Sequence, residues 1–364
     1  MMTAPVDRGA DFVVSVIVPA RNEEACLAAC LQSLVGQTGV NFEILVVDDG
    51  STDRTRTIAQ SFPRLTVVDA RPLIEGWSGK SNAMFSGAQR ARGKWLLFTD
   101  ADTVHKPGSL ARSVTEAEGY KVALLSYSPE QEVHGFRERA VMAVIFAELA
   151  HSYRPRQVCD VRSSVAAANG QYMVILREKY IEVVDSPAVR GSLLEDVALA
   201  KALKQSGEKI RFRLGADAVR THMYRNFTQL RDGWTKNLAL LFPDTGRLAL
   251  MRLVEFVLIV GATAACIFSA TRGATAPAII SGAIAAGVYA SFIARIRKAH
   301  FGWRANLAAI FGLPFFSWLL LRSRSAHRRG AVTWKGRTYG KTGGCDPKQI
   351  PAGLKPVRND NMVG

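Results

Sequence analysis

Short apolar runs alternate with amphipathic stretches along the first 245 residues of the chain. Five of these runs predict buried strands, over residues 12–18, 42–47, 65–69, 95–99 and 122–128. Between them, apolar residues recur at helical spacing, for example at Leu27, Leu31 and Leu34. Proline lacks the N–H that a sheet requires, so Pro19 is expected to end the first strand. The alternation of strands and helices predicts an α/β domain, with a mostly parallel sheet and flanking helices.

Three long apolar segments follow, over residues 253–270, 274–294 and 305–321. The first two are long enough to cross a bilayer, whose apolar core is about 30 Å thick. Glu255 lies inside the first segment and has to snorkel, pair or face protein. The third segment is marginal in length, and Gly312-Leu313-Pro314 is expected to break it. The chain is therefore predicted to carry C-terminal transmembrane helices.

The charge pattern constrains how these segments cross the membrane. If all three spanned it from a cytosolic domain, the basic tail after Leu321 would lie outside, against the positive-inside rule. A re-entrant or interfacial third segment removes this conflict and is favoured. We therefore predict a cytosolic domain over 1–245, a membrane region over 246–325 and a basic tail over 326–364. A further apolar helix, at 139–150, is too short to span and either lies on the membrane surface or is buried in the domain.

Composition supports a membrane protein rather than a nucleic-acid-binding one. The 364 residues are 48% hydrophobic and carry a formal net charge of +16. Many basic residues flank the apolar segments, where anionic lipid headgroups attract them, so no nucleic-acid partner is expected. The five cysteines form no Cys-x-x-Cys pair, and their odd count argues against a disulfide framework. The first ten residues lack an apolar core, so no signal peptide is expected.

The predicted strand 95–99 ends in Asp100-Ala101-Asp102. The carboxyl ends of strands in an open α/β sheet are where ligands bind. In an extended chain, side chains at alternate positions point the same way, so both carboxylates can reach one object. Mg²⁺ and Mn²⁺ prefer such oxygen ligands, shared with a substrate's phosphates. The pair therefore indicates a metal site or, alternatively, a solvated turn after a strand.

Other candidate groups follow in the chain. Lys80 lies beside glycine at a predicted helix start, where its charge, free amides and the helix dipole favour a phosphate. Glu195 and Asp196 begin another helix, either as functional carboxylates or only as partners of its dipole. His105 is either a further metal ligand or, as is more usual beside a Pro-Gly turn, surface structure.

Five ordered motifs together resemble the family 2 glycosyltransferases of the GT-A fold, over roughly residues 12–240. They are residues 16–23 (VIVPARNE), 46–53 (VVDDGSTD), 79–80 (GK), 100–102 (DAD) and 195–196 (ED). Three further stretches are similar to membrane-anchored members that act on lipids, namely residues 76–80, 231–237 and 334–339. Hopanoid-associated and carotenoid-type glycosyltransferases share this arrangement, as do ceramide glucosyltransferases more distantly.

The resemblance implies a role for each matching residue. Asp196 would be the general base, with Glu195 in support, and Lys80 would approach the diphosphate of a nucleotide sugar. Asp102 would hold Mg²⁺ or Mn²⁺ on that diphosphate, and Asp100 would lie near the ribose or the metal. The residues expected around the base and ribose are Pro19, Ala20, Arg21, Asn22, Glu23, Asp48 and Asp49.

One motif departs from the family pattern. Processive synthases carry Gln-x-x-Arg-Trp after the base, whereas this chain has Gln229-Leu-Arg231-Asp-Gly-Trp234. Assigning Arg231 to the diphosphate and Trp234 to the acceptor therefore rests on an imperfect match, and Arg337 is an alternative phosphate contact. The departure also weakens the case for a polysaccharide synthase.

These observations predict an inverting hexosyltransferase that moves a sugar from a nucleotide donor, a UDP-sugar by preference, to a lipid hydroxyl. The lipid would be a carotenoid, a hopanoid or a glycolipid, and the protein a multi-pass inner-membrane enzyme with a cytoplasmic catalytic domain. Two alternatives remain: transfer to a polyprenyl phosphate, and a membrane-attached nucleotide-binding or assembly protein without turnover.

Overall fold

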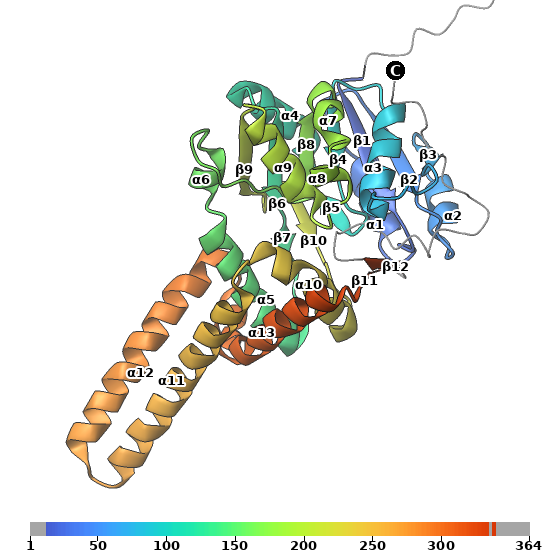
Figure 1. Cartoon of the computed structure of the whole chain (residues 1–364). Coiled ribbons are helices and arrows are strands. Elements are labelled where there is room, and N and C mark those ends of the chain that lie inside the picture. Colours follow the sequence, from blue (N-terminus) through green and yellow to red (C-terminus); the bar gives the residue numbers. More distant parts are fainter. Residues whose placement is uncertain (1–11, 335–336, 340–364) are drawn as a thin grey trace, which may run out of the picture. The chain divides into compact units, whose positions relative to one another are not determined.

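A computed structural model describes residues 12–334 and 337–339, so the predicted tail beyond 339 lies outside the described residues. Within them the chain forms two compact units (Figure 1). The first contains 12–130 and 155–221, and the second contains 131–154 and 222–339. A boundary at residue 245 stays a prediction.

The first unit is built on a seven-stranded sheet with strand order β3-β2-β1-β4-β8-β6-β9. Its strands are β1 (Val14–Ala20), β2 (Phe42–Asp48), β3 (Thr66–Asp69), β4 (Trp95–Phe98), β6 (Leu124–Ser128), β8 (Met173–Leu176) and β9 (Ile210–Leu214). Only β8 runs antiparallel to its neighbours, β4 and β6. A smaller sheet pairs β5 (Thr103–His105) with β10 (Val219–Thr221), and β7 (Glu130–Gln131) lies where the chain leaves this unit. The mostly parallel sheet predicted from the sequence is confirmed.

Helices cover both faces of the large sheet. They are α1 (Leu27–Val35), α2 (Thr55–Gln60), α3 (Gly79–Arg90), α4 (Ser109–Tyr120), α6 (Pro155–Cys159), α7 (Arg177–Val184), α8 (Pro187–Arg190) and α9 (Glu195–Gln205). The apolar stripe of α1 packs on the face that includes Val16 and Val18 of β1. Gly87 of α3 lies against Ile17, whose side chain alternates to the opposite face.

The prediction that Pro19 ends the first strand is wrong. β1 continues through Pro19 to Ala20, where it pairs with Asp48 of β2. Pairing with β4 on the other side stops at Ile17. Pro19 therefore has only one neighbouring strand, and its missing N–H disrupts no ladder on the open side. The extension carries β1 to the edge where the candidate site residues lie.

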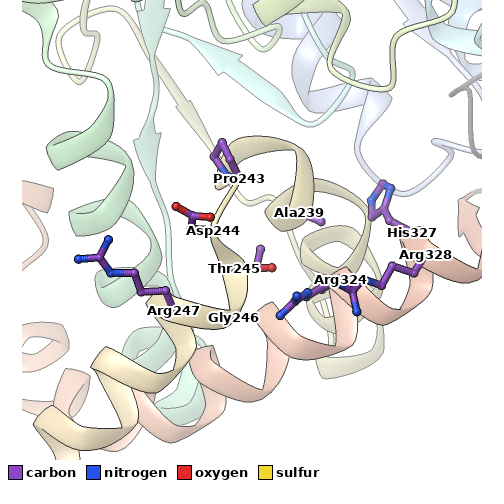
Figure 2. Close-up of a pocket in the computed structure, with 9 residues that line it drawn as sticks. All are labelled: Ala239, Pro243, Asp244, Thr245, Gly246, Arg247, Arg324, His327 and Arg328. Carbon is purple, nitrogen blue, oxygen red and sulfur yellow. The ribbon is translucent and has the colours of Figure 1, made fainter.

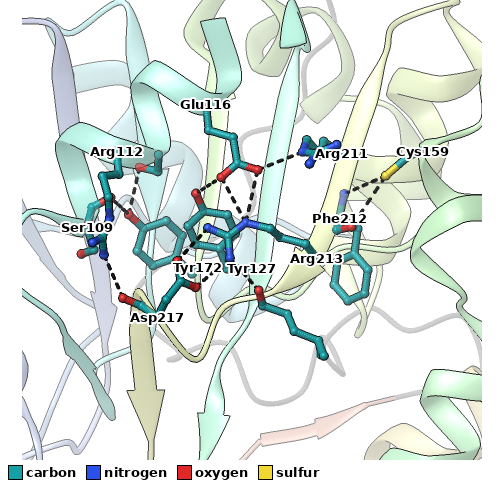
Figure 3. A network of polar contacts seen from close by, with 12 residues as sticks. Ser109, Arg112, Glu116, Tyr127, Cys159, Tyr172, Arg211, Phe212, Arg213 and Asp217 are labelled. Carbon is teal, nitrogen blue, oxygen red and sulfur yellow. Dashed lines mark hydrogen bonds and ion pairs between the residues drawn. The ribbon is translucent and has the colours of Figure 1, made fainter. Parts of the chain in front are cut away.

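A polar network joins α4 to the β6–β9 end of the sheet (Figure 3). The Glu116 carboxylate accepts hydrogen bonds from Tyr127 Oη at 2.7 Å, Arg211 Nε at 2.9 Å and Arg213 Nε at 3.0 Å. The Arg213 guanidinium also lies 3.9 Å from the centre of the Tyr127 ring. Burial opposes ionisation of Glu116, but these hydrogen bonds and charges outweigh it and lower its pKa. Glu116 thus links α4 to strands β6 and β9 and stabilises this end of the sheet.

The second unit is helical. It consists of α5 (Gly135–Ser152), α10 (Phe227–Leu241), α11 (Thr245–Thr271), α12 (Thr275–Ile296), the 3₁₀ turn η1 (Arg297–Ala299), α13 (Trp303–Arg329) and the β11–β12 hairpin (Val332–Trp334, Arg337–Tyr339). Figure 1 shows α11 and α12 as a long helical hairpin. Three helical segments of this unit are long and apolar enough to cross a membrane, namely α11, α12 together with η1, and α13. The predicted apolar helix at 139–150 is part of α5, whose residues Val141–Ile145 are buried among α10, α11 and α13, so the buried alternative is correct.

The prediction that Gly312-Leu313-Pro314 breaks the third apolar segment is wrong. α13 is continuous through Pro314. Gly312 lies so close to α5 that a Cβ there would overlap the Ala140 carbonyl. Half of the apolar stretch of α13 is buried in the unit, compared with 6% for α11 and for α12. Packing on neighbouring helices therefore supports α13 where proline removes a backbone hydrogen bond.

Four charged side chains, each at most 14% exposed, join α5, α11 and α12. Arg252 binds both oxygens of Glu148, at 2.9 and 3.2 Å, and also contacts Glu255 at 3.1 Å. Arg295 bridges the same two carboxylates, at 2.6 Å to each. The sequence allowed Glu255 to snorkel, to pair or to face protein. In the structure it pairs with Arg252 and Arg295. Two cations and two anions thus neutralise one another inside the unit.

Candidate active site

Two loops at the carboxyl ends of β1 and β2 are joined by hydrogen bonds. Asn22, at a φ of 54°, donates its N–H to Ser51 Oγ at 3.1 Å and accepts from the Thr52 N–H at 2.9 Å. The Glu23 N–H donates to Thr55 Oγ1 at 2.7 Å, and Arg21 Nη1 donates to the Asp49 carbonyl at 2.5 Å. The loops containing the motifs 16–23 and 46–53 therefore form one continuous rim, with Pro19 and Ala20 at the end of β1 beside it.

Asp48 ends β2 beneath this rim. Only 7% of its side chain is exposed. Its Oδ1 accepts the Ser51 N–H at 3.0 Å, and its Oδ2 lies 3.5 Å from Arg56, which also pairs with Asp69. Asp48 thus orders the loop that carries Asp49, and Asp49 lies nearer the surface. Contact of either residue with a nucleotide stays a prediction.

The sequence predicted an extended chain through Asp100 and Asp102, and this prediction is wrong. The chain turns between β4 and β5, because the Asp100 carbonyl accepts both the N–H and the hydroxyl of Thr103, at 3.3 and 2.7 Å. Thr221 of β10 holds the Asp102 carbonyl from the other side, at 3.2 Å. Both carboxylates remain partly exposed at the carboxyl end of β4. The residues described include no cluster of three or more His, Cys, Asp or Glu side chains suited to a metal.

His105 is a buried structural residue rather than surface structure. Only 4% of it is exposed, and its Nε2 lies 3.0 Å from Thr99 Oγ1 and 3.2 Å from Thr103 Oγ1. Burial lowers the pKa of His105 to about 3, so the ring is neutral near pH 7. It supports the turn that carries Asp100 and Asp102.

Lys80 joins two candidate carboxylates from distant parts of the chain. Its ammonium lies 2.7 Å from Asp100 and 2.7 Å from Glu195. Ser78 caps α3 by accepting the Ser81 N–H at 3.1 Å, which places Lys80 in the first turn. Burial favours the neutral amine, but the charges of Asp100, Glu195 and Asp196 outweigh it and raise the pKa of Lys80 well above its usual range. The structure therefore brings Lys80, Asp100, Glu195 and Asp196 together.

Asp196 has the electrostatic properties that a general base requires. Its Oδ2 accepts the Gly170 N–H at 2.9 Å, and its Oδ1 accepts the Val197 N–H at 2.8 Å. Burial and the adjacent Glu195 charge raise the pKa of Asp196 to about 6, against the attraction of Lys80. A carboxylate with this pKa is ionised near pH 7 and still accepts a proton effectively.

Gly170 is a site residue that our sequence reasoning did not single out. A Cβ at this position would lie 3.0 Å from Lys80 Nζ, 3.2 Å from Glu195 Oε1 and 3.5 Å from Asp196 Oδ2. A Cβ here would therefore displace the charged ends of Lys80 and Glu195 by a few tenths of an ångström. The signal in the sequence was its place in a run of small residues, 165–170, near the predicted ligand edge.

We predict that Gly170→Ala lowers the turnover number about tenfold or more, since displacement of catalytic groups by even a fraction of an ångström is costly. The thermal midpoint should change little, because the neighbours are side-chain ends that can shift. Steady-state kinetics and thermal unfolding check both expectations. Gly119→Ala is the matched control, because a Cβ there meets nothing within 4 Å. Equal turnover in the two variants would contradict the prediction.

The segment between β3 and α3 holds a second feature that the sequence did not reveal. The Arg71 guanidinium lies between two rings, 4.2 Å from Trp77 and 4.3 Å from Phe85, and Arg71 Nε donates to Asn82 Oδ1 at 2.7 Å. Gly191 lies against the Gly76 carbonyl with no room for a Cβ. These contacts fix the segment that leads to Lys80.

The remaining candidates belong to the second unit. Arg231 pairs with its neighbour Asp232 at 2.7 Å. Trp234 is 3% exposed, and its Nε1 donates to Met142 Sδ at 3.3 Å. Arg337 lies in β12. Their roles at a phosphate or an acceptor stay predictions.

Comparisons with known proteins found similarity to glycosyltransferases. The family model described as Glycosyl transferase family 2 matches residues 15–183. A 4,4'-diaponeurosporenoate glycosyltransferase of Staphylococcus aureus strain MRSA252 is 27% identical over 343 residues, covering 90% of this chain and 88% of the relative. Its counterpart in strain USA300 is 26% identical over 339 residues, with the same coverage.

A solved structure supports the fold. A mannosyltransferase from Pyrobaculum calidifontis, in complex with GDP-Man and Mn²⁺, matches with a TM-score of 0.51 and 17% sequence identity. The match covers 89% of this chain and 88% of that one. Residues 15–183 therefore form a family 2 glycosyltransferase domain, and the chain is a glycosyltransferase of the GT-A fold.

Proposed function

We propose that this glycosyltransferase transfers a sugar from a nucleotide sugar, a UDP-sugar by preference, to a hydroxyl of a membrane lipid of the carotenoid, hopanoid or glycolipid type. The observation that carries the proposal is the cluster in which Asp196, with its raised pKa, lies beside Lys80, Asp100 and Glu195. The relatives named for a carotenoid acceptor match 90% of this chain, so the match has to include most of α11–α13. This supports a lipid acceptor.

Asp196 would act as the base on the acceptor. Its carboxylate takes the proton of the acceptor hydroxyl, and the hydroxyl oxygen forms a bond to the anomeric carbon. The bond from that carbon to the diphosphate oxygen breaks, and the nucleoside diphosphate leaves with the bonding electrons. Attack from the face opposite the leaving group inverts the anomeric configuration. Gly170 and Lys80 hold the carboxylates in place, through the contacts described above.

The rim formed by the β1 and β2 loops would receive the nucleotide. Backbone and carboxylate groups at residues 19–23, Asp48 and Asp49 can accept hydrogen bonds from a base N–H and from ribose hydroxyls. Strands β1, β2 and β4 of the first unit are parallel neighbours, and the rim and the Asp100 turn lie at their carboxyl ends. This is the edge of an open α/β sheet at which ligands bind.

Asp100 and Asp102 fit a divalent cation of the Mg²⁺ or Mn²⁺ kind. Such ions are held by one or two carboxylates together with substrate phosphates, so a third protein ligand is not required. When bound, the ion would stabilise the negative charge that develops on the diphosphate. The Pyrobaculum mannosyltransferase was solved with Mn²⁺ and a nucleotide sugar, which supports this assignment.

We further propose that the protein is a multi-pass inner-membrane enzyme with a cytoplasmic catalytic domain. The support is three helices long and apolar enough to cross a bilayer, together with the location of nucleotide sugars in the cytosol. The greater burial of α13 is consistent with a third segment that re-enters or lies at the interface.

A lipid-extraction assay tests the proposed reaction. Purified full-length protein in detergent is incubated with Mn²⁺, radiolabelled nucleotide sugars and total lipid, and the organic phase is counted. We expect label in the lipid phase from one donor, with a loss of at least about tenfold on chelation or in Asp102→Ala. Mild-acid treatment and mass spectrometry of the product distinguish an O-glycoside from a polyprenyl phosphate sugar, whose anomeric phosphate bond is cleaved more readily by acid. No labelled lipid with any donor, despite nucleotide binding, would reject a lipid acceptor.

A further inference from the structure

Unit two contains a cavity that the proposed reaction does not use. It has a volume of about 340 Å³ and lies where α10 ends, α11 begins and the last turns of α13 pass (Figure 2). Ligand sites in proteins have volumes of about 300–1,000 Å³, so the cavity accommodates a small polar group. Its lining is strongly basic, with Arg247, Arg324, His327 and Arg328 against one carboxylate, Asp244.

The three arginines of this lining are placed where their charges repel. Arg324 and Arg328 are one helical turn apart on α13, and like charges at this spacing destabilise a helix. Arg247 lies in the first turn of α11, next to the positive end of the helix dipole. The Arg324 guanidinium lies against Gly246 in that same turn, where a Cβ would overlap it. Within the described part of the chain, none of these three arginines forms an ion pair.

Neutral groups in the cavity also favour an anion. α11 is 27 residues long and begins without a side-chain cap, so its first N–H groups lack the usual acceptor. Thr245 is 3% exposed and lines the cavity, and its hydroxyl makes no hydrogen bond with a described residue. Figure 2 shows this hydroxyl beside the α11 N-terminus. Uncapped amides, a buried hydroxyl and guanidinium groups are together the donors that bind a phosphoryl group.

We propose that this cavity binds a phosphoryl group, held by Arg324, Arg328 and Arg247 with Thr245 and the first amides of α11. The cavity lies at the polar end of both α11 and α13, where a helix that crosses a bilayer would leave the hydrocarbon at the level of the lipid phosphates. An anionic lipid headgroup or a soluble phosphate supplies the same chemistry. The lining residues all belong to the second unit, whereas the candidate catalytic residues belong to the first, and the existence of the site does not depend on the proposed reaction.

The test uses full-length protein in detergent micelles with added phosphatidylglycerol, diacylglycerol or inorganic phosphate. Native mass spectrometry measures retained lipid, and thermal unfolding measures protection by each probe. We expect Arg324→Gln with Arg328→Gln to lower phosphatidylglycerol retention at least about tenfold, since each charge-assisted contact contributes substantially to affinity. Arg304→Gln, an exposed arginine at the other end of α13, should retain lipid like the wild type. Thr245→Val removes one donor without changing charge and should lower retention severalfold.

The probes distinguish the two sources. Protection by phosphatidylglycerol alone would identify a lipid headgroup, whereas protection by inorganic phosphate as well would show that the phosphoryl group suffices. Diacylglycerol lacks phosphate and should give neither effect. Unchanged retention in the double variant and in Thr245→Val, or equal protection by diacylglycerol, would overturn the proposal.

Discussion

Asp196→Asn is expected to lower sugar transfer by about 10²- to 10⁴-fold, the range typical of removing a general base. The amide keeps the shape of the carboxylate, and its oxygen can still accept the Gly170 N–H while the Val197 N–H loses its acceptor. Folding and donor binding should therefore be largely preserved. Radiolabel transfer and nucleotide affinity measure the two effects. Asp160→Asn is the matched control, because that carboxylate is exposed, accepts the Arg162 N–H at 2.9 Å and lies 3.7 Å from the Arg162 Nε atom.

The pH dependence gives an independent test of the same assignment. Below the pKa of about 6, Asp196 is protonated and cannot take the hydroxyl proton. Transfer by the wild type should therefore rise tenfold per pH unit below about 6 and level off above it. The residual activity of Asp196→Asn should lose this dependence. Near-wild-type turnover in the variant would exclude the base role and favour an acceptor that is already ionised, such as a lipid phosphate.

The second large effect concerns stability. Arg295→Met leaves the buried carboxylates of Glu148 and Glu255 with one cation, Arg252, instead of two. Breaking a buried ion pair in this way costs about 3–5 kcal/mol, because a charge remains without compensation. We expect a lower midpoint of thermal unfolding for Arg295→Met in a fixed detergent, measured by intrinsic fluorescence.

A double variant separates charge imbalance from lost packing. Removing Glu255 together with Arg295, both to Met, leaves the balanced pair of Arg252 and Glu148. This variant should recover part of the lost stability, since uncharged side chains of similar size often replace buried ion pairs well. Arg304→Met controls for loss of an exposed arginine. If the double variant is less stable than Arg295→Met, charge imbalance is not the cause.

The sequence allowed prediction of the sheet and of the motifs at its edge. Continuous apolar runs located β1, β2, β4 and β6 within a few residues, because buried strands need apolar side chains on both faces. The direction of β8 was not predictable, since hydrophobicity does not encode strand orientation. The predictions that Pro19 ends a strand and that Pro314 breaks a helix failed for another reason. Each lies where tertiary packing removes the usual cost of proline.

The candidate site was predicted residue by residue but not as a geometry. Lys80, Asp100, Glu195 and Asp196 were each identified as chemistry-bearing groups in the chain. That Lys80 bridges Asp100 and Glu195 depends on how three separate segments meet, which no local pattern contains. Gly170 was overlooked for the same reason, because its importance lies in the three side chains that surround it.

The second unit is assembled from two separate stretches of chain, 131–154 and 222–339 within the described residues. A single cut therefore cannot release the first unit in soluble form. Truncation at residue 245 would retain α5 and α10 but remove α11 and α13, which cover their apolar side chains. The shortened protein would aggregate or require detergent. Designers of a soluble enzyme would instead have to replace α5 with a short linker between residues 130 and 155 and end the chain near residue 221.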